Sequence, residues 1–155
     1  MKKQIFVLAL VIIMALSLSS CDLLSIFGGV ASEGGVTVVI ENTDGTYDVY
    51  TAELDAVENK SEGAAGVVEY LSEREENPRY LDMVNSTYGA YVNAIGSIKA
   101  EENTYVLIYT SLETDSYEGA PTVLYEGITL YQAGLGLSAM TVNEDSVILF
   151  RLETF

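Results

Sequence analysis

The chain of 155 residues contains no histidine, no tryptophan and a single cysteine, Cys21. Without an imidazole, neither Ser-His-Asp nor Cys-His catalysis is available, and the usual zinc and copper ligand sets are missing too. One cysteine cannot form a disulfide within the chain. Only oxygen ligands remain for a metal, and these suit calcium or magnesium. We therefore expect a protein that is not an enzyme and that carries no cofactor.

Basic residues are also scarce, with seven Lys and Arg against 23 Asp and Glu. Two of the seven, Lys2 and Lys3, belong to the first residues of the chain. The part that follows residue 20 holds five basic and 23 acidic side chains, a net charge of −18. Such a charge repels phosphate backbones. We expect no nucleic-acid partner.

The single cysteine stands directly behind a secretory-type leader. Lys2 and Lys3 precede twelve apolar residues, 5–16, a run too short to span a bilayer, which takes about 20. The following Leu18-Ser19-Ser20-Cys21 resembles the lipobox of bacterial lipoproteins, in which the cysteine sulfur receives a diacylglycerol before cleavage. The resemblance implies a signal peptide over 1–20 and a lipid anchor at Cys21 that holds the protein on the extracytoplasmic face of the cell membrane. The alternative is an ordinary signal peptide with an accidental cysteine.

Behind Cys21 we expect a flexible tether and then one domain. The tether, residues 21–35, contains two glycine pairs and has no apolar periodicity. Order is predicted to begin at Val36, so that residues 36–155 form the domain, a size that suits one hydrophobic core. Alternating apolar residues and the turn sequence Thr-Asp-Gly-Thr predict a β-hairpin over 36–54.

One helix is predicted after this hairpin. Four apolar residues recur at the helical spacing i, i+3, i+4 and i+7: Ala64, Val67, Val68 and Leu71. Ser61 is the expected N-cap, and Asn77-Pro78 is expected to end the helix.

The rest of the chain has strand character. The predicted strands cover 80–85, 90–98, 104–111, 122–131 and 146–153. Val106 to Tyr109 and Val147 to Phe150 are apolar on both faces, which is typical of central, doubly covered strands. Residues 99–103 are predicted to form a turn between two paired strands. The pattern as a whole predicts an α+β domain with one helix packed on a curved mixed sheet.

Two stretches of this region carry a family resemblance. They are STYGAYVNAIGSIKAEENTYVLIYTS, residues 86–111, and YEGITLYQAGLGLSAMTVNEDSVILF, residues 125–150. Together they resemble the transcobalamin-like C-terminal domain, a small β-grasp-like unit that also occurs in lipid-anchored proteins of Gram-positive bacteria. The resemblance implies a β-grasp-like mixed sheet with one main packed helix. It also implies a non-catalytic ligand-binding domain that captures a corrinoid or similar small molecule, with a surface or transporter protein as partner.

Tyrosine is abundant, with 11 residues, and four of them gather in the first stretch: Tyr88, Tyr91, Tyr105 and Tyr109. Such a cluster could serve as an aromatic platform with hydroxyl groups for hydrogen bonding. The resemblance implies ligand contacts at Tyr88, Tyr91 and Tyr105, and at Leu135 in the glycine-containing loop. The alternative is that tyrosine simply suits half-exposed strands.

A second functional reading starts from three carboxylates within six residues, Glu113, Asp115 and Glu118. Their spacing could surround a calcium ion, although the EF-hand pattern is absent. The chain would then be a structural or adhesive surface module stabilised by calcium. The alternative is an exposed acidic loop.

Overall fold

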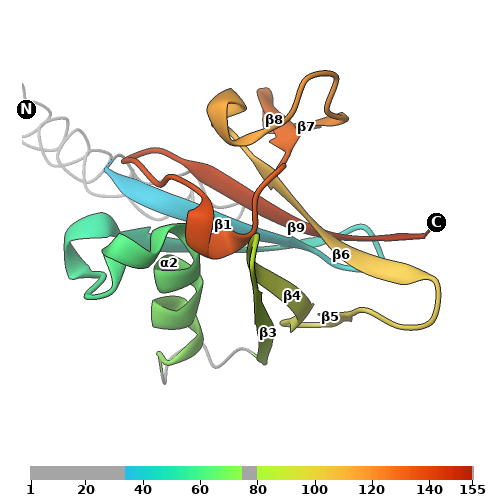
Figure 1. Cartoon of the computed structure of the whole chain (residues 1–155), viewed down its shortest axis with the longest axis horizontal. Coiled ribbons are helices and arrows are strands. Elements are labelled where there is room, and N and C mark those ends of the chain that lie inside the picture. The colour runs from blue at the N-terminus through green and yellow to red at the C-terminus, as the bar shows by residue number, and fades with distance from the viewer. Residues whose placement is uncertain (1–33, 75–79, 155) are drawn as a thin grey trace, which may run out of the picture. The chain divides into compact units, whose positions relative to one another are not determined.

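The computed structural model describes residues 34–74 and 80–154 (Figure 1). The predicted signal peptide, the lipidation site Cys21 and nearly all of the predicted tether lie outside these residues. Within the described ranges, no helix is long and apolar enough to cross a membrane.

The main sheet has six strands. In spatial order they are β2 (Tyr47–Glu53), β1 (Gly35–Glu41), β9 (Val147–Thr154), β6 (Thr104–Thr110), β8 (Ile128–Gln132) and β7 (Thr122–Tyr125). The neighbours β1 and β9 are parallel, and every other pair in this sheet is antiparallel. Figure 1 shows the blue β1 and the red β9 running together through the middle of the sheet. Paired first and last strands, flanked by antiparallel neighbours and crossed by a helix, confirm the predicted β-grasp-like α+β class.

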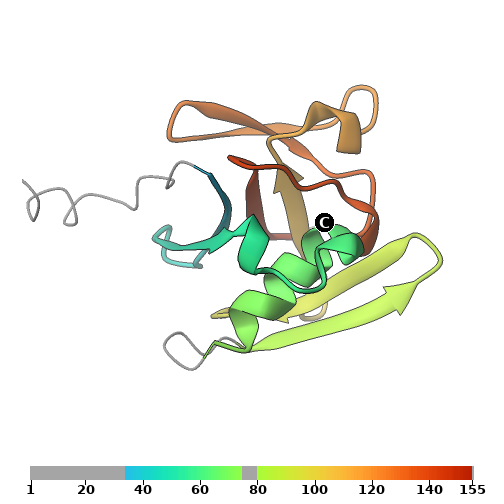
Figure 2. The ribbon, with the colours of Figure 1, turned by 90° about the vertical axis from the view of Figure 1, so that its left-hand side faces the viewer.

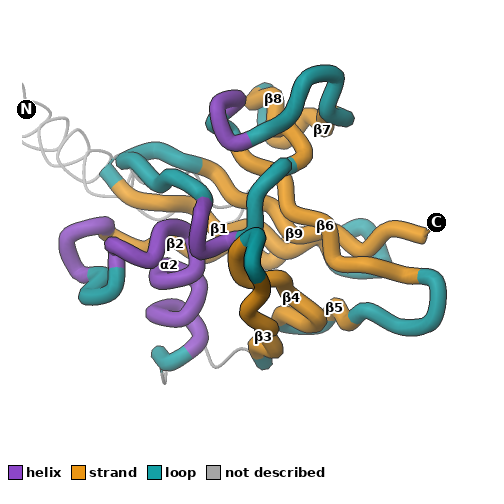
Figure 3. Tube along the Cα trace, viewed as in Figure 1, coloured by secondary structure: helices purple, strands orange, loops and turns teal. Residues whose placement is uncertain are grey.

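A second sheet of three strands contains β3 (Leu81–Ser86), β4 (Gly89–Ile95) and β5 (Ile98–Lys99) (Figure 3). The prediction of a single sheet was therefore wrong, as was the pairing across residues 99–103. The Ala100 N–H still donates to the Asn93 carbonyl oxygen at 2.7 Å, which extends the β4–β5 pairing by one residue. Asn103 then takes a positive φ of 66°, and the chain enters β6 in the other sheet.

The predicted strand 122–131 is in fact the β7–β8 hairpin. Its two-residue turn is Glu126-Gly127, with φ of 47° and 82°. Two positive φ values are what a type I′ turn requires, and Asn or Asp is the usual first residue there. Glutamate in that position concealed the turn.

The helix α2 (Gly63–Ser72) and the small sheet lie side by side on one face of the main sheet (Figure 2). At the far edge of the main sheet the β7–β8 hairpin curls over, so that its apolar side chains pack against the opposite face of β1 and β9. One apolar cluster joins α2 and β4 to β1, β6 and β9. A smaller cluster on the other face contains Leu130 and Tyr125 of the hairpin with Val147 and Leu149 of β9. The strand β9 is therefore covered on both faces over residues 147–150, as predicted. The strand β6 is covered on both faces only toward its end, because Tyr105 is exposed and Leu107 is half-buried.

The helix buries all four residues of its predicted apolar face. Its N-cap is Glu62, not Ser61, and no side chain caps it. The Ala64 N–H instead donates to the Met140 carbonyl oxygen at 3.3 Å, so the start of α2 is fixed by a loop distant in sequence. The predicted stop at residues 77–78 lies outside the described part of the chain.

Candidate ligand-binding groove

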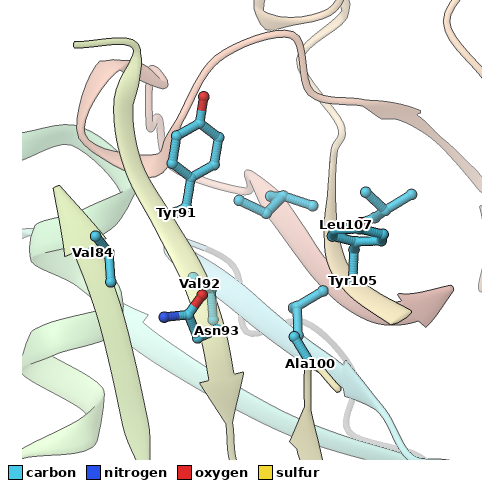
Figure 4. Close-up of a pocket in the computed structure, with 9 residues that line it drawn as sticks. Val84, Tyr91, Val92, Asn93, Ala100, Tyr105 and Leu107 are labelled. Carbon is cyan, nitrogen blue, oxygen red and sulfur yellow. The ribbon is translucent and has the colours of Figure 1, made fainter. Parts of the chain in front are cut away.

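A groove of 810 Å³ lies between β4 of the small sheet and β6 of the main sheet. Val84 and Tyr91 stand on one side, and Tyr105 and Leu107 stand on the other (Figure 4). The tyrosines are well exposed, at 47% for Tyr91 and 54% for Tyr105. Two of the predicted ligand residues are thus brought to one concave surface from strands in different sheets.

Strand alternation explains this placement. Along both strands, one set of side chains enters the core while the next set points out of it. Val92, Val106 and Ile108 are buried in the larger cluster and form the inner part of the groove. Their neighbours Tyr91 and Tyr105 consequently project into its sides.

The chemistry of the lining is apolar with few polar groups. Its polar side chains are those of Tyr91, Tyr105 and Asn93, and none of the lining residues is charged. The groove therefore offers no carboxylate, amine or thiol to act as an acid, base or nucleophile. What it offers is apolar surface, two aromatic rings and a small number of hydrogen-bonding groups.

The other two predicted ligand residues, Tyr88 and Leu135, do not line this groove. They lie together where a glycine loop meets the β3–β4 turn: the Gly136 N–H donates to the Tyr88 carbonyl oxygen at 2.9 Å. Gly136 and Gly89 touch so closely that a Cβ added at Gly136 would lie 2.6 Å from the Gly89 carbonyl carbon. The side chains of Tyr88 and Leu135 are both exposed, and ligand contact at these two residues stays a prediction.

Tyr109 does not belong to the predicted aromatic cluster. It follows Tyr105 on the same face of β6, but it packs with Tyr125 and Leu130 of the β7–β8 hairpin and is 2% exposed. Its hydroxyl donates to Glu153 Oε1 at 2.7 Å. Burial, and then the neighbouring carboxylate, raises the pKa of Tyr109 far above its ordinary value.

The predicted calcium loop also differs from expectation. Asp115 is 4% exposed, and its Oδ2 accepts a hydrogen bond from the Thr141 N–H at 2.7 Å. Glu113 and Glu118 remain exposed. In residues 34–74 and 80–154, no three acidic, histidine or cysteine side chains are grouped to hold a metal ion. The carboxylate at the centre of the predicted calcium site instead joins two loops.

Sequence reasoning missed Val84, Asn93 and Leu107 as groove residues. Leu107 lies in an apolar run that predicts a strand covered on both faces, whereas the structure leaves it half-buried at the rim. No sequence signal separates Leu107 from the rest of the apolar run Val106 to Tyr109, because the extent to which the β7–β8 hairpin reaches along β6 is set by tertiary pairing.

No family model matches the chain, and no curated protein matches it. Among solved structures, it is similar to a chain from Ruminococcus gnavus whose crystal structure is described as that of a "putative metal binding protein". The two share 16% identity with a TM-score of 0.53, over 79% of this chain and 99% of the other. At this identity the likeness shows the fold alone. The matched region is nearly the whole of the R. gnavus chain.

Proposed function

We propose that this chain is a non-catalytic binding module, held on the extracytoplasmic face of the membrane through Cys21, that captures an apolar ligand in the groove between β4 and β6. The observation that carries the proposal is the groove itself, an 810 Å³ concavity lined by apolar and tyrosine side chains. Ligand sites of proteins are typically concave, mostly apolar and about 300–1,000 Å³ in volume, with a few polar groups that fix orientation.

The anchor is supported by the leader sequence and by Leu18-Ser19-Ser20-Cys21. Metabolic labelling with a fatty-acid probe should mark the natural chain and leave a Cys21→Ala variant unmarked. Equal labelling of both chains would remove the anchor from the proposal, while the groove would be unaffected.

Corrinoids are the first small molecules to test, because the sequence resemblance implies them and Tyr91 and Tyr105 both line the groove. The chain has no histidine, so no imidazole can replace an axial cobalt ligand, and binding would rest on shape and hydrogen bonds. One small domain leaves much of such a large ligand in water, which limits affinity. A membrane transporter is the protein partner that an anchored capture domain would serve.

Metal binding does not form part of the proposal. The description of the R. gnavus protein mentions it, but the described residues of this chain bring no group of three metal-ligating side chains together.

The test is a titration of the chain from Asp22 to Phe155, which keeps the whole described domain. Nile red, a neutral apolar dye, reports on the groove by fluorescence, and calorimetry follows cobinamide and cobalamin. Replacing Tyr91 and Tyr105 together by Ala should weaken Nile red binding about tenfold, since each aromatic contact contributes about 0.5–1.5 kcal/mol.

The matched control is Tyr117→Ala, because Tyr117 is as exposed as Tyr91, at 47%, but lines no part of this groove. Its affinity for the dye should equal that of the natural chain. Equal losses in the control and in the double variant, or no dye binding at all, would refute the groove as the binding site.

A further inference from the structure

The groove is bordered by a strand edge that none of the strands in residues 34–74 and 80–154 covers. Along β6, β9 pairs with every residue from Thr104 to Thr110 on one side. On the other side β8 pairs only with Tyr109 and Thr110. At the start of the strand the Thr104 N–H donates to the Glu101 carbonyl oxygen at 3.1 Å. The part of the β6 edge that no described strand covers is therefore centred on Val106, which lines the groove.

The register shows which main-chain groups the open edge presents. The Ser111 N–H donates to the Val147 carbonyl oxygen at 2.9 Å, and hydrogen-bonded pairs alternate along an antiparallel ladder. The N–H and C=O of Val106 and Ile108 therefore point away from β9. The Ile108 carbonyl oxygen indeed accepts from the Ala133 N–H at 2.8 Å, which leaves the amide of Val106 at the centre of the open edge.

The facing edge of β4 is largely occupied. β5 pairs with β4 only at its last two residues, but the Ala90 N–H donates to Ser138 Oγ at 3.0 Å. The Asn93 carbonyl oxygen accepts from the Ala100 N–H. β4 therefore contributes mainly side chains to the groove, and β6 contributes the available main-chain groups.

An open strand edge next to apolar side chains is the arrangement that binds extended peptides by strand addition. Proteins usually protect such edges with lysine, proline or a covering loop. None of the groove-lining residues is charged or a proline. A strand on the β6 edge would continue the line of β8, and its alternate side chains would meet Tyr105 and Leu107.

The charge of the chain adds a preference for cations. Two exposed acids, Glu101 and Glu102, follow Ala100 at the rim, and the chain beyond residue 20 carries a net charge of −18. Basic residues in a peptide would be attracted to this field, and acidic ones would be repelled.

We propose that the ligand of the groove is an extended, positively charged peptide segment with apolar side chains at alternate positions, added as a strand to the β6 edge at Val106. This inference rests on the proposed use of the groove as the binding site. It names a ligand class that main-chain groups recognise, and it favours a peptide over a corrinoid.

The experiment uses three probes on the same chain, residues 22–155, labelled with ¹⁵N. The first is the peptide acetyl-KVKVKVK-amide. The second is the same peptide with every backbone amide N-methylated, which keeps charge and side chains but cannot pair as a strand. The third is Nile red. We expect the first peptide to bind at least tenfold more tightly than the second and to slow hydrogen exchange of the Val106 N–H.

Three results would overturn the inference. Equal affinity of the two peptides would mean that charge and side chains suffice. Protection of Leu124 N–H in place of Val106 N–H would put the peptide on β7, the exposed edge strand at the end of the main sheet. Binding of Nile red without any binding of the peptide would reject the peptide and leave the proposed function intact. If none of the probes binds, both the peptide inference and the proposed function fail.

Discussion

Gly66, the fourth residue of α2, is a site where the ordinary effect of replacing glycine by alanine should be reversed. Alanine normally stabilises a helix interior by about 1 kcal/mol relative to glycine. A Cβ at Gly66, however, would lie 2.1 Å from the Asn59 carbonyl oxygen and 2.8 Å from its carbonyl carbon. Both are main-chain atoms, so no rotamer change relieves the overlap. Either the helix or the preceding 3₁₀ segment has to move, and Gly66→Ala should destabilise the domain.

The size of the effect follows from two opposing contributions. Overpacking a dense core costs about 1–3 kcal/mol, and so close an approach to a backbone oxygen belongs at the upper end of that range. The helix preference of alanine offsets about 1 kcal/mol. The net loss is about 2 kcal/mol in the free energy of unfolding, which lowers Tm by roughly 6–8 °C for a domain of this size.

Urea unfolding followed by circular dichroism measures this loss. The control is the half-buried Glu69 in the same helix, where the Ala variant should exceed the Gly variant by about 1 kcal/mol. Asn59→Gly should not rescue Gly66→Ala, because the clashing carbonyl belongs to the backbone. A gain in stability for Gly66→Ala, equal to the Gly-to-Ala difference at Glu69, would refute the close packing of α2 on Asn59.

Three further outcomes are expected. Leu71→Ala should cost about 2–5 kcal/mol in urea unfolding, because Leu71 is 3% exposed in the main core; a loss below about 0.5 kcal/mol would contradict that packing. Asp115→Ala should cost about 1–3 kcal/mol by leaving the Thr141 N–H unpaired, and millimolar calcium should raise Tm no more than sodium at equal ionic strength. Burial and Glu153 raise the pKa of Tyr109 above its usual 10.0, so the unfolded chain ionises first. The free energy of unfolding should therefore fall above about pH 10, and a Tyr109→Phe variant should show a shallower fall.

The sequence contained enough to predict the local elements. The helical spacing of Val67, Val68 and Leu71 predicted which face of α2 is buried, because residues that are three or four positions apart lie on the same side of a helix. The apolar runs at Val106 and Val147 correctly marked the central strands. These features depend on neighbours within a few residues, and periodicity reports them directly.

The division into two sheets could not be predicted in the same way. Residues 90–98 and 104–110 have strand character whether or not they pair, because alternation fixes the faces of a strand and says nothing about what lies at its edges. The groove is a consequence of that missing pairing. Tyr91 and Tyr105 are predicted ligand residues and do lie on the same groove, but the open edge at Val106 between them has no signature in residue type.

The central pairing of β1 with β9 has a consequence for the order in which the domain can fold. The first described strand, β1, begins at Gly35, and its partner β9 ends at Thr154. The two strands of this pair therefore come from opposite ends of the domain sequence. When the chain emerges N-terminus first, from a ribosome or through a membrane channel, β1 appears long before β9. Until β9 has emerged, the edge of β1 that pairs with it stays unpaired. Contacts of such wide sequence separation form late and slowly. Folding should consequently be all-or-none with respect to the C-terminal strand. A chain that stops before Val147 would leave the edges of β1 and β6 that face β9 unpaired, and proteases would degrade it as an unfinished protein.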